Sequence, residues 1–263
     1  MKLSIITVTR NNLAGLRRTA ESVAAQVWRD FEWIVVDGDS SDGTKEYLQQ
    51  LSPQPDRWTS EPDRGVYDAM NKGLSAARGE YLLFLNAGDS LCSADTLQKC
   101  FRNFPGGDVV YGDAVFVYPK KEKRMIHPDR LSLYYFRHRS LCHQATFIRT
   151  ALLKDCGGYS LHYRIVSDWR QWIVWMLEGR TFRHLSLTVC RYMMDGLSTS
   201  NRKTSNRERE EVFREVLPPL YHELMIEVEA LYQKKKQKYL RWIYILSAFS
   251  LSLIITLALC LLN

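Results

Sequence analysis

The sequence predicts an α/β protein built on a mostly parallel sheet that is flanked by helices and followed by C-terminal helices. Short apolar strands alternate with segments of helical periodicity from residue 3 to residue 85, which is the pattern of parallel strands joined by right-handed crossovers. Polar clusters follow several of these strands. A final apolar stretch stands apart from the rest of the chain, whose 263 residues are enough for one large domain with appendages.

The first part of the chain shows the most regular alternation. Residues 3–8 are rich in β-branched side chains and are followed by the polar residues 9–12, after which residues 13–27 place apolar side chains at helical spacing. Strands are predicted at 3–8, 31–36, 58–61 and 81–85, and helices at 13–27, 44–51 and 66–77.

The second part is less regular. Its clearest helix begins near Asp168 and carries tryptophans at its apolar positions. Residues 119–139 are basic and aromatic without a clear period, so we expect a loop region there. The other predicted elements are a strand pair or one bulged strand at 108–118, strands at 142–148 and 189–194, and helices at 207–217 and 221–238.

The chain carries a formal net charge of +7, and much of the excess lies late in the sequence. Basic residues gather at 202–209 and 234–241, beside the apolar tail, rather than along a helix that could read a nucleic acid. We therefore expect no nucleic-acid partner. The six cysteines include no C-x-x-C pair, which argues against a zinc site or a disulfide frame.

Residues 242–262 carry no charge and are apolar apart from serine and threonine. About 20 such residues suffice to cross a bilayer as a helix, and basic residues just before them favour a cytoplasmic location for the globular part. The prediction is a single C-terminal transmembrane helix at 241–263 in the cell inner membrane, preceded by a basic helical region at 201–240. A buried C-terminal helix is the alternative.

The strand at 81–85 delivers Asn86 and Asp89 to its carboxyl end. Ligands bind at this edge of open α/β sheets, and polar clusters at 7–12 and 37–42 follow two other strands, so all three clusters are expected to converge. A carboxylate there suits a hard divalent cation that carries a diphosphate. An ordinary Asx turn would use the same residue types.

Three further segments suggest chemistry. A turn precedes a helix whose free N–H groups, with Arg64 and Lys72, could hold a phosphate, although a solvated helix face would explain the charges equally well. Asp168 opens the tryptophan-rich helix, where partial desolvation would raise its basicity, unless it simply caps the helix. His143 and Gln144 could line an acceptor site or play a structural part.

Five motifs stand in order along the chain, and they span Ser4–Asn11, Val35–Thr44, Glu61–Gly73, Phe84–Asp89 and Ser167–Trp169. With these motifs the chain resembles glycosyltransferase family 2, whose members are inverting enzymes with a GT-A fold. More narrowly it resembles the bacterial subgroup that builds capsular, exopolysaccharide or O-antigen repeat units, including colanic-acid glycosyltransferases. The resemblance implies a Rossmann-like GT-A domain over residues 1–200.

The resemblance also implies a role for each matching residue. Asp89 would hold a Mg²⁺ or Mn²⁺ ion, and Asp168 would act as the general base. The acceptor side would include His143, Gln144 and Trp169. The nucleotide-sugar would be bound by Thr9, Arg10, Asn11, Asp37, Asp39, Asp63, Arg64, Asn71, Lys72 and Asn86.

The chain departs from the family pattern at two positions. Many members carry two successive aspartates where this chain has Asp37 and Gly38. The second aspartate is missing here, so the contact to the nucleobase, and with it a preference for uridine, does not follow from the resemblance at this position. The usual first aspartate of the D-x-D metal motif is Asn86 here. Asp89 is consequently the single charged ligand expected for the metal.

The activity expected from the resemblance is inverting transfer of a sugar from a nucleotide-sugar, preferably a UDP-sugar, to a polyprenyl-diphosphate-linked saccharide. Direct displacement at the anomeric carbon needs a base near the acceptor hydroxyl and compensation of the charge on the leaving diphosphate. Two alternatives stay open. One is a binding module that recognises nucleotide-sugars without turnover. The other is a sugar nucleotidyltransferase, although residues 9–12 lack the Gly-rich basic loop usual in those enzymes.

Overall fold

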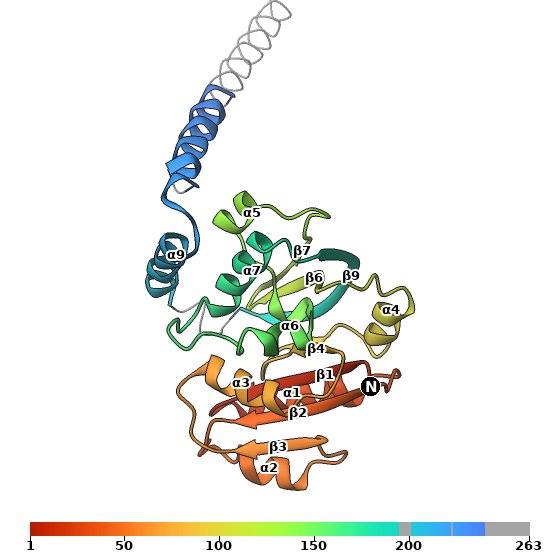
Figure 1. The fold of residues 1–263 in the computed structure, drawn as a ribbon. Helices are drawn as coiled ribbons and strands as arrows, with labels where there is room; N and C mark the ends of the chain where they lie inside the picture. The colour runs from red at the N-terminus through yellow and green to blue at the C-terminus, as the bar shows by residue number, and fades with distance from the viewer. Residues whose placement is uncertain (195–200, 222, 240–263) are drawn as a thin grey trace, which may run out of the picture. The chain divides into compact units, whose positions relative to one another are not determined.

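The computed structural model describes residues 1–194, 201–221 and 223–239 (Figure 1). Its contacts divide the chain into two compact units, Met1–Val212 and Phe213–Asn263. All the strands that the structure describes belong to the first unit. This unit is therefore the part of the chain that positions the candidate site.

A nine-stranded sheet forms the centre of the first unit (Figure 1). Its strands are β1 (Leu3–Thr9), β2 (Phe31–Asp37), β3 (Arg57–Ser60), β4 (Tyr81–Phe84), β5 (Ser90–Leu91), β6 (Val109–Tyr118), β7 (Lys121–Met125), β8 (Thr146–Arg149) and β9 (Phe182–Met193). They follow the order β3-β2-β1-β4-β8-β6-β9-β5, and β7 pairs with β6.

Strands β1 to β4 form a parallel half of the sheet, as predicted. β1 pairs in parallel with β2 and β4, and β2 pairs in parallel with β3. Both β1 and β4 are buried along their whole length, which explains their continuous apolar sequences. The carboxyl ends of these strands lie at one edge of the sheet, so the polar residues that follow them are brought together.

The other half of the sheet corrects the predicted mostly parallel arrangement. β8 runs antiparallel to both β4 and β6, β7 runs antiparallel to β6, and β5 runs antiparallel to β9. Of these strands, β6 and β9 pair in parallel. The sheet is mixed because the chain passes through a short 3₁₀ helix, η1 (His143–Ala145), near the end of β4 and then runs back along that strand as β8.

The helices are α1 (Leu13–Ala24), α2 (Thr44–Gln50), α3 (Val66–Ala76), α4 (Thr96–Arg102), α5 (Leu133–His138), α6 (Thr150–Asp155), α7 (Ser167–Leu177) and α9 (Arg202–Val216). The sequence predicts α1, α2, α3, α7 and α9 near these bounds. It does not predict α4 and α6, because so few residues reveal no period. The predicted loop region at 119–139 is wrong in part, since β7 and α5 lie within it.

Close approach of backbone and side chain holds α3 against the parallel half of the sheet. A Cβ atom on Gly73 would come within 2.4 Å of Ile6 Cγ2 on β1, so only glycine fits there without a shift. The buried side of α3 includes Tyr67, Met70 and Leu74. This packing fixes the first turn of α3 relative to the strand ends.

The transmembrane helix predicted at 241–263 lies outside the described residues. Among the helices that the structure does describe, none is both long enough and apolar enough to cross a bilayer. Residues 223–239 of the second unit are helical, but they include the lysine cluster at 234–238. The predicted inner-membrane location is corrected accordingly, since the described part of the chain gives it no spanning helix.

Candidate active site

A cavity of about 950 Å³ lies at the carboxyl ends of β1 and β4. Its walls come from the strand ends, from the first turn of α3, from η1 and from residues of α7 and α9. The predicted site residues that line it are Thr9, Arg10, Asp63, Asn86, Asp89, His143, Gln144, Asp168 and Trp169. Asp89 and Asp168 therefore share one cavity, although they lie far apart in the sequence.

Two buried polar atoms at the strand ends have no hydrogen-bond partner in the described part of the chain. They are Thr9 Oγ1, on the last residue of β1, and Asn86 Oδ1, just beyond β4. Buried polar atoms in folded proteins nearly always have a partner. Because Thr9 and Asn86 both line the cavity, a bound molecule with hydroxyl or amide groups would supply the missing hydrogen bonds.

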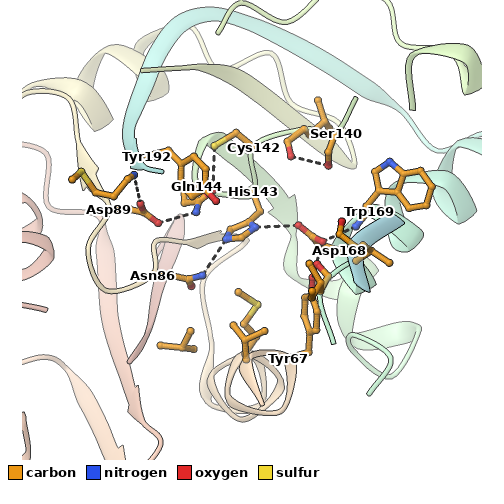
Figure 2. Close-up of a pocket in the computed structure, with 18 of the residues that line it drawn as sticks. Tyr67, Asn86, Asp89, Ser140, Cys142, His143, Gln144, Asp168, Trp169 and Tyr192 are labelled. Carbon is orange, nitrogen blue, oxygen red and sulfur yellow. Dashed lines mark hydrogen bonds and ion pairs between the residues drawn. The ribbon is translucent and has the colours of Figure 1, made fainter. Parts of the chain in front are cut away.

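Asp89 is held by hydrogen bonds within the protein, and only 5% of it is exposed. Its Oδ2 accepts a hydrogen bond from Gln144 Nε2 at 2.8 Å, and its Oδ1 accepts one from the backbone N–H of Met193 at 2.9 Å (Figure 2). Thr19 Oγ1 donates to the Asp89 carbonyl at 2.7 Å. These contacts tie the segment after β4 to η1, β9 and α1.

The described residues around Asp89 do not make up a complete ligand set for the predicted metal ion. Asp89 is the single charged ligand expected, and the one hydrogen bond that each of its oxygens accepts does not by itself exclude a cation. Within the described ranges, no group of three or more His, Cys, Asp or Glu side chains is arranged to hold a metal ion. A hard cation needs several oxygen ligands, and one carboxylate does not supply them.

Asp168 lies in the first turn of α7 and accepts hydrogen bonds on both carboxylate oxygens. Oδ1 accepts from Tyr67 Oη at 2.7 Å and from the backbone N–H of Trp169 at 2.8 Å, and Oδ2 lies 3.1 Å from His143 Nδ1. The N-cap of α7 is Val166, so Asp168 does not serve as the cap.

The environment of Asp168 lowers its basicity, contrary to the prediction. Burial by itself would raise the pKa of the carboxyl, but the hydrogen bonds from His143, Tyr67 and Trp169 outweigh burial and lower the pKa below its ordinary value. Donors that favour the charged form replace the water that burial removes. Asp168 is thus a carboxylate that stays ionised near neutral pH.

His143 joins the two sides of the cavity. Its Nδ1 faces Asp168 Oδ2, and its Nε2 lies 3.2 Å from Asn86 Nδ2. Figure 2 shows the imidazole between these two side chains, with Gln144 reaching from the same segment to Asp89. The short helix η1 therefore connects the end of β4 to the start of α7. The proposed acceptor role of His143 and Gln144 stays a prediction.

Several residues predicted to bind the nucleotide-sugar do not line the cavity, and they are Asn11, Asp37, Asp39, Arg64, Asn71 and Lys72. Asp37 is fully buried and accepts hydrogen bonds from the hydroxyls of Ser40 and Ser60. Asn71 exchanges two hydrogen bonds with the backbone of Tyr159, which ties α3 to the turn after α6. Their roles in donor binding stay predictions.

The charges of Arg64 and Lys72 are paired with carboxylates. Arg64 lies 3.1 Å from Asp68 one turn along, and Lys72 lies 2.8 Å from Glu61. The solvated helix face that the sequence left open accounts for both pairs. Asn11 and Asp39 are in the loops after β1 and β2, where both backbones have positive φ.

The sequence did not single out Tyr67 and Arg209, which also line the cavity. Tyr67 donates to Asp168, and the Arg209 guanidinium lies over the Trp169 ring at 4.7 Å. Burial lowers the pKa of Arg209. Tyr67 could have been found from its place within the Glu61–Gly73 motif, whereas Arg209 belongs to the basic run at 202–209, which the sequence assigned to a separate basic helical region.

Comparison with known proteins identifies the fold and the family. A family model described as Glycosyl transferase family 2 matches residues 4–164, which is more than half of the chain. The chain belongs to glycosyl transferase family 2. This assignment confirms the broader of the two resemblances drawn from the sequence motifs.

Curated relatives within family 2 are named as glycosyltransferases. A PGL/p-HBAD biosynthesis glycosyltransferase from Mycobacterium bovis is 38% identical over 172 residues, covering 63% of this chain and 66% of the relative. An uncharacterized glycosyltransferase from Mycobacterium tuberculosis is 36% identical over the same length, covering 65% of its chain. The chain thus spans slightly less than two thirds of these relatives. The family and these names together support a transferase enzyme.

Two solved structures share the fold of this chain. TarS from S. aureus, in complex with UDP-GlcNAc, has a TM-score of 0.64 and 21% identity and covers 82% of this chain and 65% of its own. The mannosyltransferase PcManGT from Pyrobaculum calidifontis, in complex with GDP-Man and Mn²⁺, has a TM-score of 0.63 and 17% identity and covers 81% and 63%. These likenesses support the predicted GT-A fold.

The narrower resemblance to colanic-acid glycosyltransferases is not confirmed. Curated relatives that are 38% identical to the chain are mycobacterial proteins named for PGL/p-HBAD biosynthesis. The five motifs are therefore informative about the family, while the subgroup is a matter for proposal.

Proposed function

We propose that this family 2 protein is an inverting glycosyltransferase that moves a sugar from a nucleotide-sugar, preferably a UDP-sugar, to a hydroxyl of a lipid-linked saccharide. One observation carries the proposal. The unsatisfied polar atoms of Thr9 and Asn86 and the ionised carboxylate of Asp168 line the same cavity. A donor-binding edge and a proton acceptor would then face the same cavity, as direct displacement requires.

The donor would bind at the strand ends. Thr9 and Asn86 offer acceptor oxygens that lack partners, and Arg10 lies beside them on the cavity wall. The structural neighbours were solved with UDP, UDP-GlcNAc or GDP-Man, which supports a nucleotide-sugar as the ligand class. The arginines Arg164 and Arg209 also line the cavity, and their charge would offset that of the leaving diphosphate.

The transfer would need no covalent enzyme intermediate. As the acceptor oxygen bonds to the anomeric carbon, its proton passes to Asp168 and the bond from that carbon to the diphosphate oxygen breaks. A single displacement inverts the anomeric centre. A carboxylate with a lowered pKa is a weak base, so the expected transition state has a largely broken bond to the leaving group, and the proton moves late.

The acceptor would approach from the side of η1 and α7. His143, Gln144 and Trp169 lie there on the cavity wall. A lipid-linked saccharide is the acceptor class of the bacterial surface-polysaccharide subgroup that the motifs resemble. The proposal of this class rests on that resemblance.

A nucleoside diphosphate release assay tests the proposal. The protein is incubated with UDP-glucose, UDP-N-acetylglucosamine and GDP-mannose, with saccharide acceptors, and the released nucleotide is identified. The account predicts release of the nucleoside diphosphate by the wild type. Asp168→Asn should lower turnover about 10²–10⁴-fold, while calorimetry shows that donor binding is retained.

Other outcomes of this assay would support the alternatives instead. Donor binding without any release would indicate a binding module. Conversion of the nucleotide-sugar and added pyrophosphate into a nucleoside triphosphate and a sugar 1-phosphate would indicate a nucleotidyltransferase. Full activity of Asp168→Asn would remove Asp168 from the chemistry.

A further inference from the structure

His143 is the residue through which the two sides of the cavity are connected. It lies on η1, and 18% of its side chain is exposed. Each ring nitrogen has its own partner, with Asp168 Oδ2 at 3.1 Å from Nδ1 and Asn86 Nδ2 at 3.2 Å from Nε2 (Figure 2). An imidazole whose two nitrogens are both engaged is fixed in orientation.

The chemistry of the partners determines the tautomer. An ionised carboxylate can only accept, so Nδ1 carries the proton in the contact with Asp168. In neutral imidazole Nε2 is then an acceptor, which matches the amide N–H groups of Asn86. In this arrangement Asn86 Oδ1 is the amide atom that has no partner among the described residues. Asn86 can therefore accept a hydrogen bond from a bound donor molecule.

The carboxylate of Asp168 is held from three directions. Tyr67 on α3 and the backbone N–H of Trp169 occupy Oδ1, and His143 occupies one position on Oδ2. A carboxylate has about four acceptor positions. One position on Oδ2 is therefore left for the hydroxyl of an incoming molecule.

We propose that His143 is a positioning residue, which aims the free acceptor position of Asp168 at the acceptor hydroxyl and couples it through Asn86 to the donor end of the cavity. This inference rests on the proposed function and deepens it. The bound donor would contact Asn86, Asn86 holds the imidazole, and the imidazole holds the catalytic carboxylate. A chain of hydrogen bonds would thus link the bound nucleotide-sugar to the position of the Asp168 carboxylate.

The groups that face Asp168 come from several elements. They are His143 on η1, Tyr67 on α3, Tyr159 in the turn after α6, and Arg209 on α9. The hydrogen bond from His143 is the main contact that lowers the pKa of Asp168 against the effect of burial. Removal of the imidazole should therefore raise the pKa of Asp168.

Three variants of one residue separate the two contacts. His143→Asn places an amide N–H near the position of Nδ1 and can still donate to Asp168. His143→Gln places its amide near the position of Nε2 and can reach Asn86 instead. His143→Ala removes both contacts.

The experiment measures kcat, KM for the donor, and the pH dependence of both for the wild type and the three variants. His143→Ala should lower kcat about tenfold to a hundredfold, the range seen when a partner that orients a reactive group is lost. The acidic limb of its kcat–pH profile should move to higher pH, because the hydrogen bond that lowers the pKa of Asp168 is lost. His143→Asn can still donate to Asp168, so the acidic limb of its kcat–pH profile should stay near the wild-type position. His143→Gln lacks this contact, so its acidic limb should move in the same direction as that of His143→Ala.

The outcomes distinguish this inference from the proposed function. If the wild type transfers no sugar from any donor, the proposed function fails and the inference fails with it. The inference alone is overturned if the wild type is active and the acidic limb of the kcat–pH profile is the same in all variants. It is also overturned if kcat is unchanged in His143→Ala. Thermal unfolding checks folding, and the comparison of His143→Asn with His143→Gln decides the matter if His143→Ala does not fold.

Discussion

His127 is a buried histidine in the segment between β7 and α5. It is 3% exposed, its backbone N–H donates to Asp113 at 3.1 Å, and its Nδ1 lies 2.6 Å from Tyr135 Oη. Its Nε2 has no hydrogen-bond partner among the described residues. Burial lowers the pKa of His127 to about 4. The fold therefore requires a neutral imidazole at this position.

The stability of the protein should depend on pH through His127. The unfolded chain protonates this residue near 6.5, whereas the folded protein does so only near 4. The free energy of unfolding should therefore be unaffected by His127 above pH 6.5 and should fall by about 3 kcal/mol as the pH decreases toward 4. Urea unfolding of the wild type and of His127→Asn at pH 7, 5.5 and 4 measures it.

The control for this prediction is His162→Asn, because His162 is exposed. His127→Asn should lose less stability than the wild type between pH 6.5 and 4, and His162→Asn should follow the wild type. Parallel pH profiles for all three proteins would show that His127 is not the residue responsible.

Single residues differed in how well the sequence could identify them. Asn86 and Asp168 were identified because each stands where a strongly patterned element ends or begins. The contact between Tyr67 and Asp168 joins residues 101 positions apart, so only tertiary packing reveals it. The pKa of Asp168 was misjudged because burial was visible in the pattern of tryptophans while the hydrogen-bond donors were not.

The contact between α3 and β1 sets the position of the first turn of α3. Gly73→Ala should destabilise the protein by about 1–3 kcal/mol, because the added Cβ would meet Ile6 Cγ2 at 2.4 Å and the core must shift. Helix propensity favours alanine by up to about 1 kcal/mol, which reduces the loss without reversing it. Urea unfolding gives the free-energy difference.

Ser75→Ala on the same helix is the matched control, since Ser75 is exposed. Its free energy of unfolding should stay within about 0.5 kcal/mol of the wild type. Equal or greater stability of Gly73→Ala would mean that α3 does not pack against β1 as closely as the structure shows.

Whole elements were predicted well where burial produces a clear pattern. The parallel strands β1, β2 and β4 are mostly apolar or β-branched and are buried, and α1 and α3 are long enough to show a period. The antiparallel pairs were missed because β5 and β8 have two and four residues, and strand direction leaves no mark in so short a sequence. In the segment 119–139 the helix α5 has six residues, again too few for a period.

The convergence of distant segments on one cavity follows from the topology of the whole molecule. Parallel strands place their carboxyl ends at one edge, so the meeting of Thr9 with Asn86 could be predicted before the fold was known. The metal site could not be judged in the same way. Whether a carboxylate such as Asp89 is available depends on donors from η1 and β9, which the sequence does not place.

The central claim is that a nucleotide-sugar binds at the ends of β1 and β4. The buried hydroxyl of Thr9 has no hydrogen-bond partner among the residues that the structure describes, so Thr9→Val should leave the stability of the free protein unchanged or slightly higher while weakening donor binding about threefold to tenfold. Thr150→Val is the matched control. Its hydroxyl is also buried but donates to the Gly79 carbonyl at 2.6 Å, so this variant should lose stability and bind donors normally.

Calorimetric titration of UDP-glucose, UDP-N-acetylglucosamine and GDP-mannose into the wild type and these two variants tests this claim most directly. The account predicts that at least one donor binds the wild type, that Thr9→Val binds it more weakly, and that Thr150→Val binds it equally well. Equal affinity of the wild type and Thr9→Val, or no binding of any donor to the wild type, would contradict the account.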